Sequence, residues 1–224
     1  MRERKEPTYR ERWGLVAAVH AAFFRCLRHR LGLRVYGIYA RPLAPPKGLD
    51  HAMPSFSYRL FEQGEAEALI ARAKRHELDL PEIFVRNALA KGDVCDAILH
   101  DDAVVSYGWS AFSPTHDSEG VYVGFGEKYR YGYKSFTLPE FRGRHLPRVF
   151  KPLRDGYCIA RGCTHTVAFV AVDNRSSIRA TLAQSYRRIG FAGYLKRGPI
   201  FWSFRTPGVR RCGFDFFVPP KAGR

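Results

Sequence analysis

The chain has 224 residues, of which 46% are apolar, and this predicts a globular protein with one ordinary domain and some additional structure. Its 37 Lys and Arg against 21 Asp and Glu give a formal net charge of +16, which favours anionic partners or else reflects arginines on solvated faces. The five cysteines include no C-x-x-C pair and no histidines at zinc spacing, which excludes a disulfide-rich scaffold, so we expect no metal and a reducing, cytoplasmic location.

The first 55 residues differ from the rest and are predicted to form an N-terminal appendage. A basic head leads into the apolar run Trp13–Phe24, which predicts a helix that ends near Leu31 with arginines in its last turns. A strand-like stretch over 33–39 follows, and a linker rich in Pro and Gly completes the segment.

The N-terminal helix has two interpretations. Residues 1–30 contain eight Lys or Arg and three Glu, so residues 1–31 suit peripheral contact with an anionic membrane. Packing of the helix on the domain's own core is the favoured interpretation. The apolar run is too short to span a bilayer.

Residues 56–224 are predicted to form the main domain, in which strands and helices alternate. Strands are expected at 56–61, 94–100, 104–113, 121–125, 131–138 and 201–204, and helices at 64–74 and 81–91. Asp101 and Asp102 form a turn-like pair, so the strands on either side of them should form a hairpin. The stretch 113–120 is expected to be a loop.

The segment 136–150 predicts an anion site. Its strand stops at Pro139, a tight turn carries Arg142, Gly143 and Arg144, and a helix is expected to continue to about residue 161. Unpaired amides and the positive end of the helix dipole converge at such a turn, and the arginines add charge-assisted contacts. Nine Lys or Arg against two acidic residues lie between residues 128 and 161, so a diphosphate would suit this region.

A buried strand and another helix are predicted next. Residues 164–173 are apolar at nearly every position, as in a strand covered on both faces. Asn174 ends this strand, and the following helix, with its two leading serines as caps, is expected at 178–188. Gly190 should end that helix.

These motifs resemble those of the GNAT superfamily of N-acyltransferases. The runs P-E-F-R-G, Asn174 with a serine-rich helix start, and Y-R-R-I-G-F are similar to the family patterns P-x-Y-R-G-x-G, N-x-x-[AS] and Y-x-x-x-G-F. The resemblance spans about residues 56–205, and its diagnostic motifs lie within 137–191. It implies an α+β (mixed α/β) fold with a splayed, mostly antiparallel sheet of six to seven strands, flanked by helices and preceded by an N-terminal helical appendage.

The resemblance also implies that acetyl-CoA, or another acyl-CoA, binds as cosubstrate between the fourth and fifth strands. The pantetheine would pair with the backbone of three residues, Phe136, Thr137 and Leu138. The pyrophosphate would be held by the amides of five residues, Arg142, Gly143, Arg144, His145 and Leu146. The thiol end would lie beside Asn174 and Ser177.

The sequence departs from the family pattern in three ways. His145 and Pro147 stand where the family usually has glycine or alanine, so close backbone approach is harder and Pro147 supplies no amide. Asn174 and Tyr186 are twelve residues apart instead of about seven, and five additional helical residues would rotate a side chain by roughly 140°. Either Tyr186 or Thr181 therefore faces the thiol. Finally, the motifs mark no general base.

Acyl transfer to an amine needs a deprotonated nucleophile, a stabilised carbonyl oxygen and a proton for the departing thiolate. Tyr186 is the candidate acid, with a core tyrosine as the alternative interpretation. Glu127 is the candidate base, placed where a strand-borne carboxylate could act through water, although a solvated turn glutamate is the favoured interpretation.

The expected function is transfer of an acetyl or other acyl group from CoA to a primary amine of a small molecule or peptide, by a monomer or homodimer. An anionic acceptor would suit the charge. The alternative is a noncatalytic module of the same fold that binds nucleic acid or an anionic membrane through its basic face. Aromatic residues that alternate with cations could stack nucleic acid bases, but the ordinary alternation of side chains along a strand explains them more simply. These aromatic residues are Tyr122, Phe125, Tyr129, Tyr131 and Tyr133.

Overall fold

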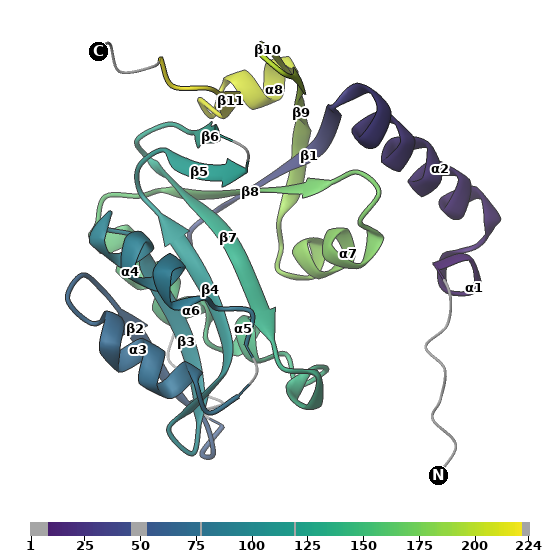
Figure 1. Ribbon diagram of the computed structural model, residues 1–224. Helices are drawn as coiled ribbons and strands as arrows, with labels where there is room; N and C mark the ends of the chain where they lie inside the picture. The colour runs from purple at the N-terminus through teal and green to yellow at the C-terminus, as the bar shows by residue number, and fades with distance from the viewer. Residues whose placement is uncertain (1–8, 46–52, 77, 119, 221–224) are drawn as a thin grey trace. The chain divides into compact units, whose positions relative to one another are not determined.

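The computed structural model describes residues 9–45, 53–76, 78–118 and 120–220. They form a mixed α+β fold (Figure 1). The chain divides into two compact units. The central unit comprises Ala40–His116 and Gly124–Ala168, and the terminal unit comprises Met1–Tyr39, Asp117–Val123 and Phe169–Arg224.

Five strands of the larger sheet build the central unit, in the order β2, β3, β4, β7, β8. Their bounds are Ser57–Phe61 (β2), Val94–His100 (β3), Ala103–Ala111 (β4), Tyr129–Thr137 (β7) and His165–Ala171 (β8), whose last residues belong to the terminal unit. The first four strands pair antiparallel with their neighbours, and β8 pairs parallel with β7. The predicted hairpin of β3 and β4 is confirmed, with Asp101 and Asp102 in its turn.

Two helices cover one face of these strands. They are α3 (Ala66–Ala73) and α4 (Glu82–Ala90), close to the predicted ranges. Leu69, Val85 and Leu89 from the helices pack with Phe61 and Trp109 from the strands, and all five are at most 1% exposed. This core supports β4 and, through β4, the strand that leads into the predicted anion loop.

Three short helical elements follow β7: η2 (Pro139–Phe141), α5 (Leu146–Val149) and α6 (Lys151–Ala160). Leu138 and Leu146, on either side of the loop, are buried against Ile98 and Val105. The loop between them is therefore held at both ends by the core, while Arg142–His145 are exposed.

The terminal unit begins with α1 (Tyr9–Trp13), α2 (Leu15–Cys26) and a π-helical turn (Leu27–Leu31). The predicted single helix is thus interrupted at Gly14. Strands β10, β9 and β1 occupy consecutive positions in the larger sheet, with bounds Ile200–Arg205, Arg187–Arg197 and Leu33–Pro42. β1 continues into the central unit. A smaller sheet contains β11 (Asp215–Phe217), β6 (Val121–Gly124) and β5 (Thr115–Ser118).

The core of the terminal unit is aromatic. Tyr194 and Phe216 are fully buried, and Tyr36 and Phe169 pack around them with ring centroids 4.7 to 6.3 Å apart. The helices α7 (Arg175–Ala183) and α8 (Pro207–Arg210) complete this unit.

Several sequence predictions are corrected. The larger sheet has eight strands among the described residues instead of six to seven, because β1 lies in the sheet and β9 occupies residues assigned to the end of a helix. The helix after Asn174 ends at Ala183, not near residue 188. Part of the loop predicted at 113–120 is strand β5. The predicted domain boundary at residue 55 adjoins residues 46–52, which lie outside the described residues, and it stays a prediction.

Candidate functional site

The parallel pair of β7 and β8 opens after three residues. Tyr129, Arg130 and Tyr131 are aligned with His165, Thr166 and Val167. Beyond Tyr131, β7 continues to Thr137 with no β8 partner among the described residues. In the strand order of the central unit these are the fourth and fifth strands, so the splay that the resemblance implies is confirmed there.

A β-bulge lies in this open half of β7. Trp109 of β4 is aligned with Tyr133, but Tyr107 is aligned with Phe136, so β7 has one residue more than β4 in this interval. Lys134 has a φ of 41°, in the left-handed region that residues other than glycine rarely adopt. A bulge leaves backbone groups out of the regular ladder, which suits a strand that pairs with a ligand.

The backbone of Phe136–Leu138, the predicted pantetheine partner, already makes contacts within the central unit. The Leu138 amide donates to the Val105 carbonyl at 3.0 Å, and the Arg142 Nε donates to the Thr137 carbonyl at 3.0 Å. The Ser106 hydroxyl donates to the Phe136 carbonyl at 3.1 Å. A pantetheine that paired with the Thr137 carbonyl would displace the Arg142 side chain.

Four consecutive amides in the next loop lack a backbone hydrogen bond of normal geometry within the described part of the chain. Gly143, Arg144, His145 and Leu146 donate no backbone hydrogen bond to any described residue. Gly143 has a φ of 81° and His145 a φ of 57°, both left-handed. Successive amides in such alternating conformations converge into a concavity that binds anions. The predicted tight turn that carries Arg142, Gly143 and Arg144 is present, and its role as an anion site stays a prediction.

The arginines of this loop face no carboxylate. Neither Arg142 nor Arg144 has an acidic partner within ion-pair distance among residues that the structure describes. Each guanidinium instead lies over a ring, Arg142 over Phe136 at 5.7 Å and Arg144 over Phe141 at 5.3 Å. Both charges are thus available to a bound anion.

The helix behind the loop is anchored by a buried ion pair. Arg41 of β1 donates to both carboxylate oxygens of Asp155 in α6, each at 2.7 Å, and the Ala44 amide adds a third contact at 3.3 Å. Burial would raise the pKa of Asp155, but the hydrogen bonds and charge of Arg41 outweigh burial and lower that pKa.

A polar group that the sequence analysis missed lies beside the bulge. The Tyr133 hydroxyl donates to Asp93 at 2.5 Å, and Lys91 contacts the same carboxylate at 2.9 Å. Burial raises the pKa of Asp93 although both partners act to lower it. No motif marks these residues, because they meet only when β7 pairs with β4.

The predicted residues at the thiol end lie in the terminal unit. Asn174 caps α7, since its side-chain oxygen accepts from the Ser177 amide at 3.1 Å and from the Ser176 hydroxyl at 2.9 Å. The prediction that the serines cap this helix is corrected, because asparagine one turn earlier performs that role. Its oxygen is occupied, so its amide group is the part left for a ligand.

Tyr186 lies between α7 and β9 and is 8% exposed. Ser185 before it has a φ of 67°, so the chain turns sharply out of the helix. The predicted rotation of 140° assumed continuous helix to Tyr186 and does not apply. Thr181 lies in the last turn of α7 and is half-buried.

Glu127 is exposed in the turn between β6 and β7 and is not on a strand. Its observed position in a turn therefore agrees with the favoured interpretation, a solvated turn glutamate. It precedes Tyr129, at the end of β7 opposite to Thr137.

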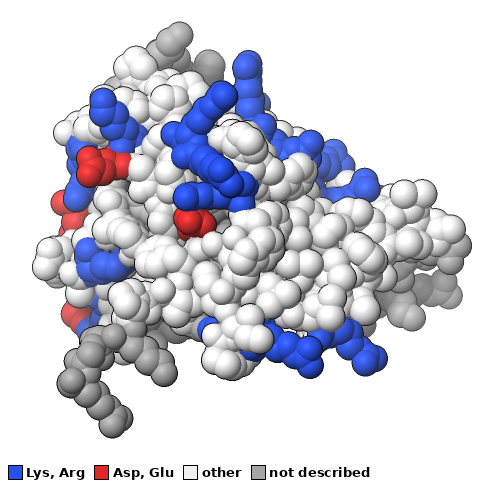
Figure 2. Space-filling model, turned by 90° about the horizontal axis from the view of Figure 1, so that it is seen from above, with Lys and Arg blue, Asp and Glu red and all other residues white. Residues whose placement is uncertain are grey.

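The aromatic residues near β7 pack on one another. Tyr131 and Tyr133 stack with centroids 5.4 Å apart, and Tyr129 stacks on His165 at 5.1 Å. Tyr131 and the cation Arg130 are nearly inaccessible, at 5% and 2% exposed. These residues do not form an exposed surface on which bases could stack. Lys and Arg side chains do outnumber acidic ones on the face shown in Figure 2.

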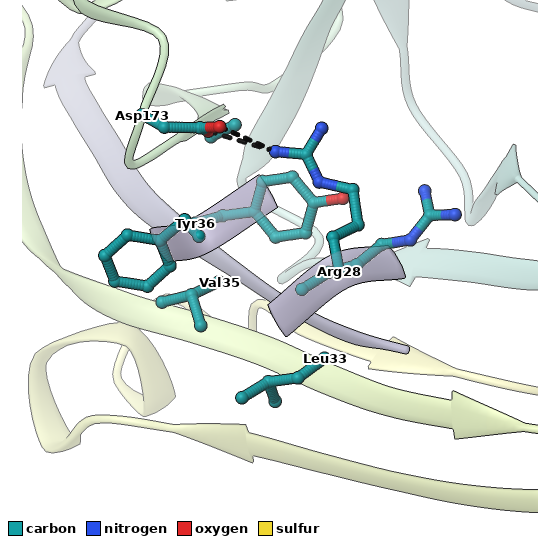
Figure 3. Close-up of a pocket in the computed structure, with 8 residues that line it drawn as sticks. Arg28, Leu33, Val35, Tyr36 and Asp173 are labelled. Atoms are coloured by element: carbon teal, nitrogen blue, oxygen red, sulfur yellow. Dashed lines mark hydrogen bonds and ion pairs between the residues drawn. The ribbon is translucent and has the colours of Figure 1, made fainter. Parts of the chain in front are cut away.

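The terminal unit also contains a small pocket (Figure 3), lined by Phe24, Arg28, Leu33, Arg34, Val35, Tyr36, Ala171 and Asp173. The Arg28 guanidinium points toward Asp173 and contacts both carboxylate oxygens, at 3.1 and 2.9 Å. Burial, and then the charges of Tyr194 and Asp117, raise the pKa of Tyr36. The pocket wall thus has a paired carboxylate and a phenol that stays protonated.

The described residues contain no group of three His, Cys, Asp or Glu that could hold a metal ion. They also include no helix long and apolar enough to cross a membrane.

No protein-family model and no curated protein matches the chain. Similar solved structures include a functionally unknown conserved protein from Staphylococcus epidermidis, at 8% identity and a TM-score of 0.49, over 75% of this chain and 63% of that one. A tandem GNAT protein from the clavulanic acid biosynthesis pathway is 17% identical, with a TM-score of 0.49, over 83% of this chain and 58% of that one. The aminoglycoside N-acetyltransferase AAC(6')-Iy in complex with CoA is 13% identical, with a TM-score of 0.45, over 68% of this chain and 95% of that one.

This chain therefore spans less than two thirds of the first two of those proteins. It is similar to GNAT acetyltransferases at low identity and at TM-scores below 0.5.

Proposed function

We propose that this protein is an N-acyltransferase that moves an acetyl or other acyl group from CoA to a primary amine. The observation that carries the proposal is the loop Gly143–Leu146, whose four amides make no backbone hydrogen bond to a described residue, at the end of a strand whose last half has no β8 partner among the described residues. Four consecutive amide donors suit a diphosphate, and an unpaired strand edge suits an extended pantetheine.

In this proposal Arg142 and Arg144 hold the diphosphate, and the open half of β7 lies along the pantetheine. The amine attacks the thioester carbonyl carbon, the carbon–sulfur bond breaks, and Tyr186 gives its proton to the departing thiolate. Glu127, or solvent near it, takes the proton from the amine through water. Asn174 and Ser177 are proposed to lie beside the thiol. An acceptor with negative charge suits the net charge of +16.

The first experiment is calorimetric titration of the full chain with acetyl-CoA. We expect a Kd in roughly the micromolar range, weakened about tenfold by Arg142→Ala, because one charge-assisted hydrogen bond is lost. Arg210→Ala, which removes an exposed arginine of the terminal unit, is the matched control and should leave the Kd unchanged.

A second titration distinguishes the diphosphate contact from general charge attraction. S-acetylpantetheine lacks the diphosphate, so it should bind more weakly than acetyl-CoA. Its Kd should be the same for the unchanged protein and for Arg142→Ala. Absence of acetyl-CoA binding would overturn the enzyme proposal. Steeply salt-dependent binding of an oligonucleotide in its place would favour the noncatalytic alternative.

The acceptor can be sought with acetyl-CoA and a mixture of cell metabolites, by looking for products heavier by one acetyl group. An N-acyltransferase should yield such products and free CoA thiol together. Thiol release without an acylated amine would mean hydrolysis of the thioester.

A further inference from the structure

Most of the large apolar side chains of α2 point away from the fold, while Phe24 is half-buried and lines the small pocket. Ala17 and Ala21 are its buried residues, at 1% and 4% exposed. Val16, Val19 and Phe23 are 81%, 62% and 56% exposed. A surface helix ordinarily turns its large apolar residues inward, so α2 has an apolar face that no described residue covers. The favoured prediction, that this helix packs on the core, holds for Ala17, Ala21 and, in part, Phe24.

The exposed residues form one continuous strip. At about 100° per residue, they fall within an arc of roughly 120° along the whole length of the helix. We call this the apolar strip, and its members are Leu15, Val16, Val19, Ala22, Phe23 and Cys26. A strip of this width is typical of a helix that lies in an interface, with one face in an apolar medium.

Positive charge surrounds the apolar strip. On the same helical projection Arg25 lies at one margin and His20 at the other, while Arg12 and Arg30 are exposed beyond the two ends. Residues 9–31 contain five arginines and one glutamate, and α2 itself has no acidic residue. Neither Arg25 nor Arg30 has a carboxylate partner within the described part of the chain.

The helix is fixed to the terminal unit and presents the strip in a defined direction. Arg28, in the turn after α2, pairs with Asp173, and the Tyr9 hydroxyl donates to the Asp173 carbonyl at 2.8 Å. Arg179 of α7 lies over the Trp13 ring at 5.4 Å. These contacts involve α1 and the turn after α2, and none of them uses a residue of the apolar strip, so the strip stays exposed.

A second copy of the chain is a poor occupant of this face. Two apolar strips in contact would bring together the arginines at their margins, and α2 offers no carboxylate to pair with them. An anionic lipid surface complements both features, because acyl chains accept the strip while the arginines extend to phosphate headgroups. The helix of twelve residues is about 18 Å long, less than the hydrocarbon thickness, which suits a position parallel to the surface.

We infer that α2 docks the terminal unit on an anionic phospholipid bilayer, with the apolar strip in the headgroup–acyl boundary. This inference does not depend on the proposed acyl transfer. It concerns a surface of the terminal unit that contains none of the candidate acyl-CoA residues.

The test is co-sedimentation of the full chain with phosphatidylcholine vesicles that contain or lack phosphatidylserine. We expect binding to the anionic vesicles that falls with salt, and little binding to pure phosphatidylcholine. The paired substitution Val19→Asp with Phe23→Asp should lower the partition coefficient by about tenfold or more, because two apolar side chains no longer enter the lipid. Arg25→Glu should lower it by about fivefold or more.

Matched variants keep the test specific. Ile83 of α4 is 67% exposed and lies in the central unit, so Ile83→Asp adds a charge at an equally exposed apolar site without touching α2. Arg210→Glu reverses an exposed arginine elsewhere in the terminal unit. Both should bind vesicles nearly as the unchanged protein does. Far-ultraviolet circular dichroism should show the same fold for every variant, since all these side chains are exposed.

A second measurement reports on the strip itself. Cys26 lies on the apolar strip and is exposed, so an environment-sensitive fluorophore can be attached to it. Its emission should shift to the blue with anionic vesicles. The inference is overturned if the Val19→Asp and Phe23→Asp variant binds as well as the unchanged protein. It is also overturned if that variant dissociates a dimer while vesicle binding is absent in both proteins.

Discussion

Arg41 and Asp155 form a bidentate ion pair in the interior of the central unit, with two nitrogen–oxygen distances of 2.7 Å and both side chains 1% exposed. The pair joins β1 to α6, the helix that follows the anion loop. A buried charge that loses its partner is strongly destabilising, whereas removal of both charges costs much less.

Asp155→Asn should therefore lower the free energy of unfolding by roughly 3–5 kcal/mol, because Arg41 then stays buried without its counter-charge. Urea unfolding followed by circular dichroism measures this loss. The control is the double change Arg41→Met with Asp155→Leu, which should lower the free energy of unfolding by less than Asp155→Asn does. Equal losses would mean that packing, and not charge, is the contribution of this pair.

The same pair predicts how stability depends on pH. The folded pKa of Asp155 is lowered, so its contribution is present above the unfolded value of about 3.9 and is lost as pH falls through the folded value. The stability difference between the unchanged protein and Asp155→Asn should shrink below about pH 4. A difference that stayed constant into that range would contradict the assignment.

His145 is predicted to be strained. A residue with a side chain at φ 57° costs about 1 kcal/mol relative to glycine, so His145→Gly should stabilise the protein by about that amount. Gly143→Ala should destabilise the protein, because Gly143 has a φ of 81°. A Cβ at this position would meet no atom within 4 Å, so the loss of stability would come from the backbone conformation alone. Thermal unfolding measures both changes. A stabilising Gly143→Ala would show that the loop conformation differs from the one described.

Tyr186→Phe tests the proposed acid. Loss of the phenolic proton donor should lower kcat by about a hundredfold while the KM for acetyl-CoA changes little. The burial of Tyr186 makes an unfolding measurement on the same variant necessary. Thr181→Ala is the control and should leave kcat nearly unchanged. The reverse pattern would assign the role to Thr181.

Thiol reactivity tests the burial of the cysteines. Cys26 is exposed, while the other four are buried. Burial raises the pKa of the Cys158 thiol to about 11 and raises the pKa of Cys95, Cys163 and Cys212. The native protein should react with Ellman's reagent at one fast site, which Cys26→Ser removes. More than one fast thiol would contradict this burial.

Short-range patterns predicted most elements correctly where local interactions decide the structure. The hairpin of β3 and β4 follows from alternating side chains around Asp101 and Asp102, and the turn at Arg142-Gly143-Arg144 follows from Pro139 before it. The local pattern does not predict β9, because glycines are poor strand residues and Gly190 resembles the end of a helix. At Gly193 the reason is tertiary, since a Cβ there would clash with the Arg34 carbonyl and the Phe204 ring.

The sequence by itself determined that residues 136–150 make a strand, a basic turn and a helix, because turn chemistry and charge act within a few residues. Only the tertiary structure decided that four amides from Gly143 to Leu146 make no backbone hydrogen bond to a described residue, that β7 separates from β8 after Tyr131, and that Val16, Val19 and Phe23 of α2 face outward. The physical reason is that pairing and burial depend on residues far apart in the chain, and a local pattern has no information about them.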